Sequence, residues 1–251
     1  MQDLLLDNEG RSKYIYYKYT LLLKERLNVE KRIIAGLVSL PVAAVIALIA
    51  VFLMGNPIIP FMDVAYWSEI VSGPFYEIAQ KIYIAVHVLL TFGLWALYRY
   101  LSDYKEAERF SFWGFMFIVW GICLTLPVLG ILAYVNPYLA QFYLEGNTTI
   151  PDIINRIIIE DSLYLGIPAA IFYTTGTILM GIGLLKANTL PRIVSFVLMP
   201  YGLLLSLGLT VPTLLILAWL FLFASSFSIT YYRFIVSENE EENDEDEEYI
   251  M

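Results

Sequence analysis

Long apolar runs, separated by short polar or charged stretches, dominate this sequence. Most of these runs approach the roughly 20 residues that a helix needs to cross the hydrocarbon core of a bilayer. The pattern predicts an all-α fold, a six-span transmembrane helix bundle. The six predicted spans are Ile33–Met54, Ile78–Tyr98, Phe110–Val135, Leu163–Leu185, Ile193–Leu207 and Val211–Tyr231.

The division between the fifth and sixth spans depends on one turn signal. Residues 193–232 carry no charge, and this stretch is too long for one span but long enough for two. Residues 207–212, Leu-Gly-Leu-Thr-Val-Pro, supply the plausible turn within it, because Gly and Pro break helices. We therefore expect the chain to turn between Leu207 and Pro212.

The positions of Lys and Arg predict how the bundle is oriented. Basic residues near the ends of spans favour the cytoplasmic side. With six spans and the N-terminus inside, 13 of the 15 basic residues fall on the cytoplasmic side, and only Lys81 and Arg156 fall outside. The sequence therefore predicts a multi-pass protein of the cell (plasma) membrane with both termini in the cytoplasm.

Three regions follow from this topology. Residues 1–32 form a basic and aromatic cytoplasmic arm, residues 33–233 form the transmembrane domain, and residues 234–251 form an acidic tail expected to be disordered. The arm could lie as a helix on the cytoplasmic leaflet, or it could pack on this protein or a partner. Both interpretations stay open.

The composition supports a membrane protein and assigns the net charge to one segment. Hydrophobic residues make up 59% of the chain and charged residues 16%, against about 25% charged in soluble domains. Nine of the 24 acidic residues lie between Glu238 and Glu248, which leaves 15 acids against 15 bases elsewhere. We expect the lipid bilayer and other membrane subunits, or a homo-oligomer, as partners. A basic partner suits the tail, and no nucleic acid is expected.

Polar residues on the second span form a stripe along one side of the predicted helix. They fall within about a third of the helix circumference, and polar groups in a membrane usually face the bundle interior or a wet cavity. The stripe suits passage of protons or solutes, or capture of an anionic headgroup. Alternatively, the first acid and the lysine pair with each other, and the histidine bonds a neighbouring helix. Its members are Glu77, Gln80, Lys81, His87, Thr91 and Trp95.

Small residues on the third and fourth spans predict close helix packing. Spacings of four and seven place such residues on one face, where helix backbones can approach each other. The residues are Gly114, Gly121, Gly176, Thr177 and Gly181.

The predicted outer segment Asn136–Asp161 carries two further features. Residues Asp152–Glu160 have the pattern of a short helix in the membrane interface. Asn147, in Asn147-Thr148-Thr149, is a candidate glycosylation site.

The sequence carries no catalytic constellation that would identify an enzyme. His87 is the sole histidine, and one imidazole without a second His or a Cys partner is a poor metal or haem site. We therefore expect no metal, no cofactor and no catalytic residues.

Two short motifs resemble a widespread family of prokaryotic multi-span membrane proteins that has no established activity. They are residues 176–192, from Gly176 through Lys186 to Pro191-Arg192, and residues 32–36, Arg-Ile-Ile-Ala-Gly. The resemblance implies a prokaryotic membrane protein and brings no activity with it.

Three functions remain open on this basis. The first is a non-catalytic subunit or scaffold of a larger membrane assembly. The second is a small transporter or channel that uses the stripe on the second span, and the third is an intramembrane enzyme that modifies lipid.

Overall fold

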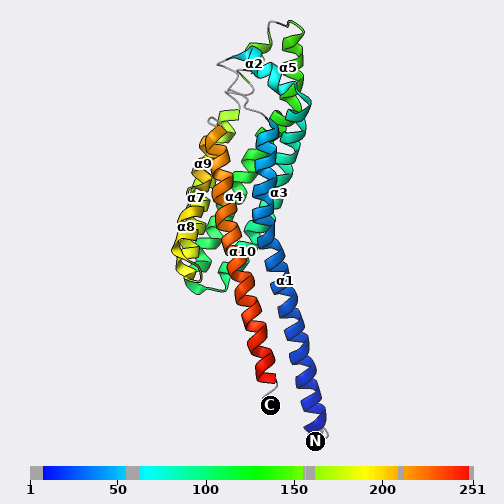
Figure 1. Cartoon of the computed structure of the whole chain (residues 1–251), viewed down its shortest axis with the longest axis vertical. Coiled ribbons are helices and arrows are strands. Elements are labelled where there is room, and N and C mark those ends of the chain that lie inside the picture. The colour runs from blue at the N-terminus through cyan, green and yellow to red at the C-terminus, as the bar shows by residue number, and fades with distance from the viewer. Residues whose placement is uncertain are drawn as a thin grey trace, which may run out of the picture.

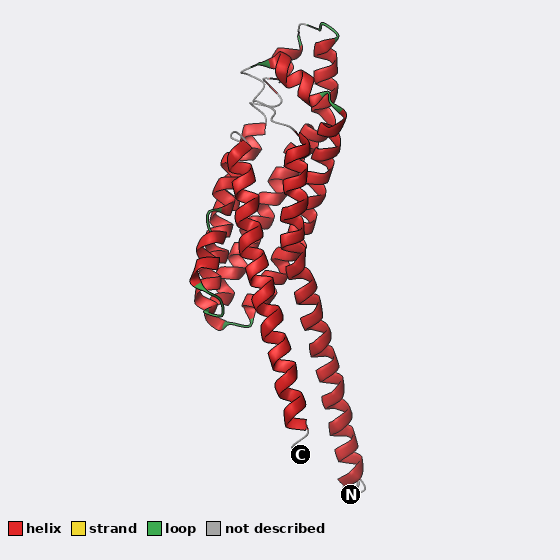
Figure 2. Ribbon diagram, in the orientation of Figure 1, coloured by secondary structure: helices red, strands yellow, loops and turns green. Residues whose placement is uncertain are grey.

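The fold is all-helical in the computed structural model, which describes residues 8–54, 63–147, 149–154, 156, 162–208 and 212–248. Figure 2 shows helices joined by short loops, and no strand occurs in these ranges. The helices are α1 (Asn8–Met54), α2 (Val64–Val71), α3 (Pro74–Ser102), α4 (Lys105–Gly130), the π-helical η1 (Ile131–Val135), α5 (Asn136–Leu144), α6 (Ile150–Ile154), α7 (Ser162–Ala187), α8 (Arg192–Leu198), α9 (Tyr201–Gly208) and α10 (Pro212–Glu248).

The long helices run along a common direction and form one elongated bundle (Figure 1). The closest packing joins α4 to α7, α1 to α3 and α1 to α10. Five helical segments in the described ranges are long and apolar enough to cross a membrane. They are Val29–Met54, Pro74–Ser102, Lys105–Leu144, Tyr164–Ala187 and Thr213–Phe234. The all-α fold predicted from the sequence is confirmed, and the five long apolar helices support its multi-pass membrane character.

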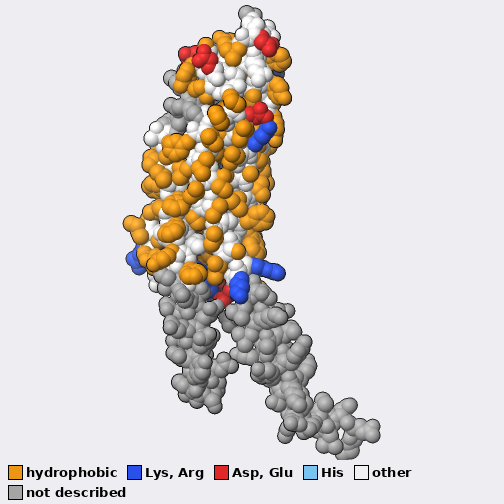
Figure 3. Space-filling model, turned by 45° about the vertical axis from the view of Figure 1, so that its right-hand side comes forward, with side chains coloured by type: hydrophobic (Ala, Val, Ile, Leu, Met, Phe, Trp, Pro, Cys, Tyr) orange, Lys and Arg blue, Asp and Glu red, His pale blue; other side chains and the backbone are white. Residues whose placement is uncertain are grey.

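Hydrophobic side chains cover the middle of the bundle surface, and charged side chains gather near its ends (Figure 3). Phe52, Phe92, Ile171 and Phe196 are each more than half exposed. A water-soluble surface would not show so many large apolar side chains side by side. This belt is the surface that a bilayer would cover.

The predicted fifth span is not one helix. Its residues form α8 and α9, which are joined by a turn at Met199 and Pro200, and together they make an apolar segment of Arg192–Gly208 that is shorter than the five long ones. Proline has no N–H to donate to the preceding turn. The Thr177 hydroxyl donates to the Met199 carbonyl at 3.1 Å, which satisfies a polar group at the interruption.

The helix of the third predicted span continues beyond Val135. Five π-helical residues precede Asn136 and Pro137, and α5 then carries the helix to Leu144. Proline is tolerated in the first turn of a helix, and a π segment shifts the hydrogen-bonding register just before it. The helix therefore does not end at Val135, where the predicted third span ends, and Asn136 is buried.

The interfacial helix and the disordered tail predicted from the sequence are only partly found or differ in the structure. Helix α6 covers the first residues of the predicted interfacial helix Asp152–Glu160, and most of its remainder lies outside the described residues. Helix α10 continues to Glu248, where the sequence led us to expect a disordered tail. A helix already nucleated by a packed segment extends at little cost, and Glu is a good helix former.

The N-terminal arm and the first predicted span belong to one helix. Helix α1 runs without interruption from Asn8 to Met54. In Figure 1 its N-terminal part and the C-terminal part of α10 both extend beyond the bundle at the same end.

Candidate functional site

His87 lies in the middle of α3 and is 1% exposed. Its Nδ1 is 2.9 Å from the Tyr83 carbonyl oxygen, one turn earlier on the same helix. A carbonyl can only accept, so Nδ1 carries the proton, and in the neutral form of this ring Nε2 is an acceptor. The backbone of α3 therefore fixes both the tautomer and the direction of the imidazole.

Three aromatic side chains contact His87, and a fourth, Tyr201, joins the group through Trp219. Edge-to-face contacts link His87 to Tyr83, Tyr173 and Trp219, with ring centroids 5.1, 6.5 and 6.3 Å away. Trp219 donates its indole N–H to the Tyr83 hydroxyl at 2.9 Å, and Tyr201 packs against Trp219 with centroids 5.7 Å apart. We call Tyr83, His87, Tyr173, Tyr201 and Trp219 the aromatic centre. It contains side chains from α3, α7, α9 and α10.

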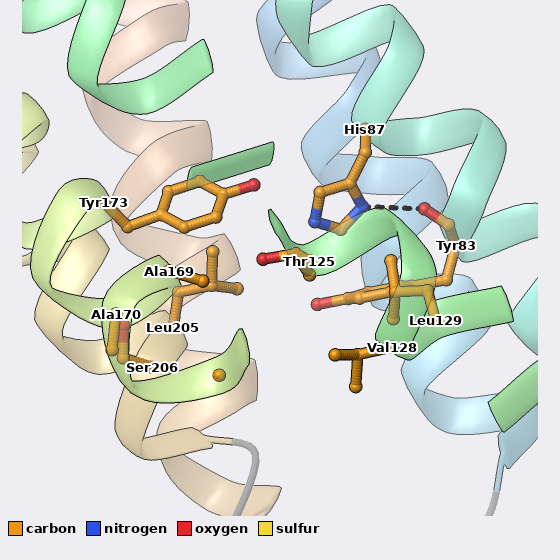
Figure 4. A pocket seen from close by; sticks show the side chains of 11 residues that line it. Tyr83, His87, Thr125, Val128, Leu129, Ala169, Ala170, Tyr173, Leu205 and Ser206 are labelled. Carbon is orange, nitrogen blue, oxygen red and sulfur yellow. Dashed lines mark hydrogen bonds between the residues drawn. The ribbon is translucent and has the colours of Figure 1, made fainter. Parts of the chain in front are cut away.

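A cavity of about 30 Å³ lies beside the aromatic centre, between α3, α4, α7 and α9. Figure 4 shows the His87 ring and the Tyr83 and Tyr173 hydroxyls directed toward the space between these helices. The other polar lining groups are Thr125 and Ser206, whose hydroxyls donate to the Gly121 and Gly202 carbonyls of their own helices. The lining residues are Tyr83, His87, Thr125, Val128, Leu129, Gly166, Ala169, Ala170, Tyr173, Leu205 and Ser206.

The structure divides the stripe predicted on the second span. His87 and Gln80 are buried, Thr91 is half-buried, and Lys81 and Trp95 are exposed. The order follows helix geometry, because His87 and Lys81 differ by about 120° around the axis. The stripe therefore straddles the edge of the buried face of α3, and only its His87 side faces the interior.

The members of the stripe other than His87 make their contacts away from the cavity. Lys81 forms the expected ion pair with Glu77, and its ammonium group lies 5.1 Å from the centroid of the Tyr134 ring. Thr91 donates its hydroxyl to the His87 carbonyl at 2.9 Å, and Gln80 donates to the Met54 sulfur at 3.3 Å. These contacts hold the side chains locally and form no continuous polar path with His87.

The small residues singled out on the third and fourth spans lie where helices approach each other. A Cβ placed on Gly114 would be 2.7 Å from the Met180 nitrogen, and one placed on Gly176 would be 2.8 Å from the Gly114 oxygen. Gly121 faces Tyr173, Gly181 faces Met199, and Thr177 bonds the Met199 carbonyl. Gly114, Gly121 and Gly176 thus lie between α4 and α7, while Thr177 and Gly181 face the α8–α9 segment.

A second polar group of side chains lies where α1 and α10 leave the bundle. Arg233 pairs with Glu30 at 2.7 Å and lies over the Tyr100 ring, 5.7 Å from its centroid. Tyr100 donates its hydroxyl to the Thr189 hydroxyl at 3.0 Å. We call Glu30, Tyr100, Thr189 and Arg233 the base cluster. It ties α1, α3 and α10 to the connection between α7 and α8.

Tyr104 stands next to the base cluster on the short connection between α3 and α4. Partial burial, with the neighbouring Tyr100, raises the pKa of Tyr104 to about 12. Its hydroxyl therefore stays protonated at neutral pH and adds no charge to this end of the bundle.

Asn147 is exposed beyond the end of α5. Its side-chain oxygen accepts hydrogen bonds from the backbone N–H and the hydroxyl of Thr149, at 3.1 and 2.8 Å. Among the described residues, no group of three or more His, Cys, Asp or Glu side chains is arranged to hold a metal ion. Comparisons with protein-family models, curated proteins and solved structures find no match to this chain.

Sequence reasoning found His87 but missed the other members of the aromatic centre. Tyr and Trp in membrane proteins usually lie at the two interfaces. Tyr173 instead lies near the middle of the predicted fourth span, and Trp219 lies well inside the last one. An aromatic residue with a polar atom at such depth was the available signal, because a buried hydroxyl or indole N–H requires a partner.

Proposed function

We propose that this protein is a six-span membrane protein with both ends in the cytoplasm, and that it serves as a non-catalytic subunit or scaffold of a larger membrane assembly. The observation that carries the proposal is the pair of long helices, α1 and α10, that extend together beyond the bundle at one end (Figure 1). A bundle in the bilayer with two helices projecting from it is suited to holding a partner.

The course of the chain supports six crossings. Helices α1, α3, α4, α7 and α10 provide five, and the consecutive α8 and α9 follow the bundle from the end of α7 back toward the start of α10 (Figure 1). An interrupted span is compatible with a bilayer when neighbouring helices satisfy its backbone, as Thr177 does at Met199.

The distribution of basic residues supports the orientation. Arg99, Lys105, Lys186 and Arg192 lie at helix ends on the side from which α1 and α10 project. Basic residues near short connections are retained in the cytoplasm. The projecting helices would then present a basic segment, residues 11–32, and an acidic one, residues 238–248. The acidic segment suits a basic partner.

The native mass tests the subunit function. We expect the protein, extracted from its own membrane in mild detergent, to migrate in a complex larger than a small homo-oligomer. Mass spectrometry should identify fixed partner chains in that complex. A chain that migrates alone or as a small homo-oligomer would contradict the subunit function.

Removal of the acidic extension tests the role of α10. A variant that ends at Phe234 keeps the base cluster and the packed part of α10. We expect it to fold and to lose the partner, because the acidic surface of α10 beyond the bundle is missing. The matched control keeps the length but replaces the nine acids with glutamine. If both variants retain the partner at the native level, the extension is not the docking element.

A second candidate function, a small transporter or channel, is favoured by the cavity next to His87. Any polar route would pass through this cavity rather than along the exposed side of α3, because Lys81 lies outside it. In proteoliposomes we expect His87→Ala to change solute flux, while Lys81→Ala leaves it unchanged. Equal flux in the wild type and both variants would eliminate this function.

A further inference from the structure

Tyr173 and His87 present complementary polar atoms to one cavity without bonding each other. The Tyr173 hydroxyl is buried and has no hydrogen-bond partner among the described residues. His87 uses Nδ1 on the Tyr83 carbonyl, so Nε2 remains an acceptor. A buried hydroxyl without a partner is destabilising, and a bridging molecule would remove that penalty.

We propose that this cavity is a binding site for a neutral, water-sized molecule, and that water occupies it as a bridge between the Tyr173 hydroxyl and His87 Nε2. The site would connect α3 to α7 deep inside the bundle. It stands independently of the subunit function and of the transport function.

The size of the cavity limits the ligand. Its volume is about 30 Å³, and a buried water needs roughly 10–15 Å³. The space is about that of one to two water molecules, and a lipid headgroup or an aromatic cofactor ring is larger. Water therefore matches the space.

The chemistry of the lining selects a neutral molecule that both donates and accepts. None of the 11 lining residues is Asp, Glu, Lys or Arg, so an ion would be buried without a counter-charge. Tyr173 supplies a donor. Acceptors come from His87 Nε2 and from Thr125 and Ser206, whose hydroxyl protons are already used on backbone carbonyls. A buried water requires two to four such partners, and the cavity provides them.

The single histidine makes the proposal testable in a membrane. Protein labelled with ¹⁵N-histidine and reconstituted in lipid bilayers gives one imidazole for solid-state NMR. Although His87 is buried, we expect polarisation to transfer from water protons to its ring. We also expect the Nε2 signal to be that of a nitrogen that accepts a hydrogen bond. The Nδ1 signal, which reports the bond to the Tyr83 carbonyl, serves as the internal check that α3 is intact.

Two tyrosine variants test whether the effect belongs to the cavity or to any buried tyrosine hydroxyl. Tyr173 and Tyr201 both carry buried hydroxyls without partners among the described residues, but only Tyr173 lines the cavity. We expect Tyr173→Phe to weaken the water transfer and shift Nε2 toward a non-bonded acceptor, and Tyr201→Phe to leave both unchanged. Ala169→Val, which fills the cavity and retains Tyr173, should also remove the transfer.

Three results would overturn the proposal. They are absence of water transfer in the wild type, an Nε2 signal that is the same in the wild type and Tyr173→Phe, and equal effects of Tyr173→Phe and Tyr201→Phe. Persistence of the transfer in Ala169→Val, with the Nδ1 signal intact, would place the water elsewhere and count against the site as well.

Discussion

Replacement of Gly114 by alanine should destabilise the bundle by about 1–3 kcal/mol, which is the usual range for overpacking. The added Cβ would lie 2.7 Å from the Met180 nitrogen and 3.0 Å from the Gly176 oxygen. Both are backbone atoms, so no side chain can rotate away, and α4 and α7 must separate. The loss should appear as a lower midpoint of thermal unfolding in detergent, about 2–4 °C for each kcal/mol.

The same helix offers a matched control. A Cβ on Gly130 meets no atom within 4 Å, so Gly130→Ala adds the same methyl group without a clash. Alanine is favoured over glycine in a helix by about 1 kcal/mol, and this variant should be as stable as the wild type or more stable. Equal midpoints for Gly114→Ala and Gly130→Ala would show that the α4–α7 approach is looser than the structure has it.

Replacement of Trp219 by alanine should cost about 3–5 kcal/mol, the range for removal of a buried aromatic side chain. Trp219 is fully buried, packs against three rings of the aromatic centre and donates to the Tyr83 hydroxyl. Lipid does not refill the space, and packing between helices is the main force that holds a membrane bundle together. Thermal unfolding in detergent would measure the loss.

Trp95 provides the comparison for Trp219. It is 44% exposed and lies on the outer side of α3, where lipid replaces whatever the ring contacts. Trp95→Ala should therefore change stability by less than about 1 kcal/mol, as is usual for surface substitutions. If Trp95→Ala is as damaging as Trp219→Ala, the assignment of interior and lipid-facing sides of α3 is wrong.

The limits of sequence reasoning are clearest at the stripe on α3. Periodicity places His87 and Lys81 within one third of the circumference, but it cannot say where the buried face of the helix begins. That boundary is set by the helices that pack on α3, and it passes between these two residues. As a result His87 enters the aromatic centre, while Lys81 pairs with Glu77 at the surface.

The positions of helix ends show the same limit of sequence reasoning. Asn136-Pro137 and the segment before Pro212 look equally like breaks in the sequence, because proline cannot donate a hydrogen bond. The chain passes through the first within a continuous helical segment that includes η1. At the second, α9 ends at Gly208 and α10 begins at Pro212, and a further interruption falls at Met199 and Pro200. A neighbouring helix decides the outcome, since Thr177 can satisfy a carbonyl that the break leaves free.

The sequence by itself determined that this protein is an all-helical membrane protein, because apolar runs of bilayer length have few other stable structures. It also identified the small residues at which helices approach and the one histidine at depth. The tertiary structure decided which side chains meet that histidine. Tyr83 lies one turn away on the same helix, but Tyr173 and Trp219 come from α7 and α10. Such contacts between segments far apart in the chain leave no periodic trace in the sequence.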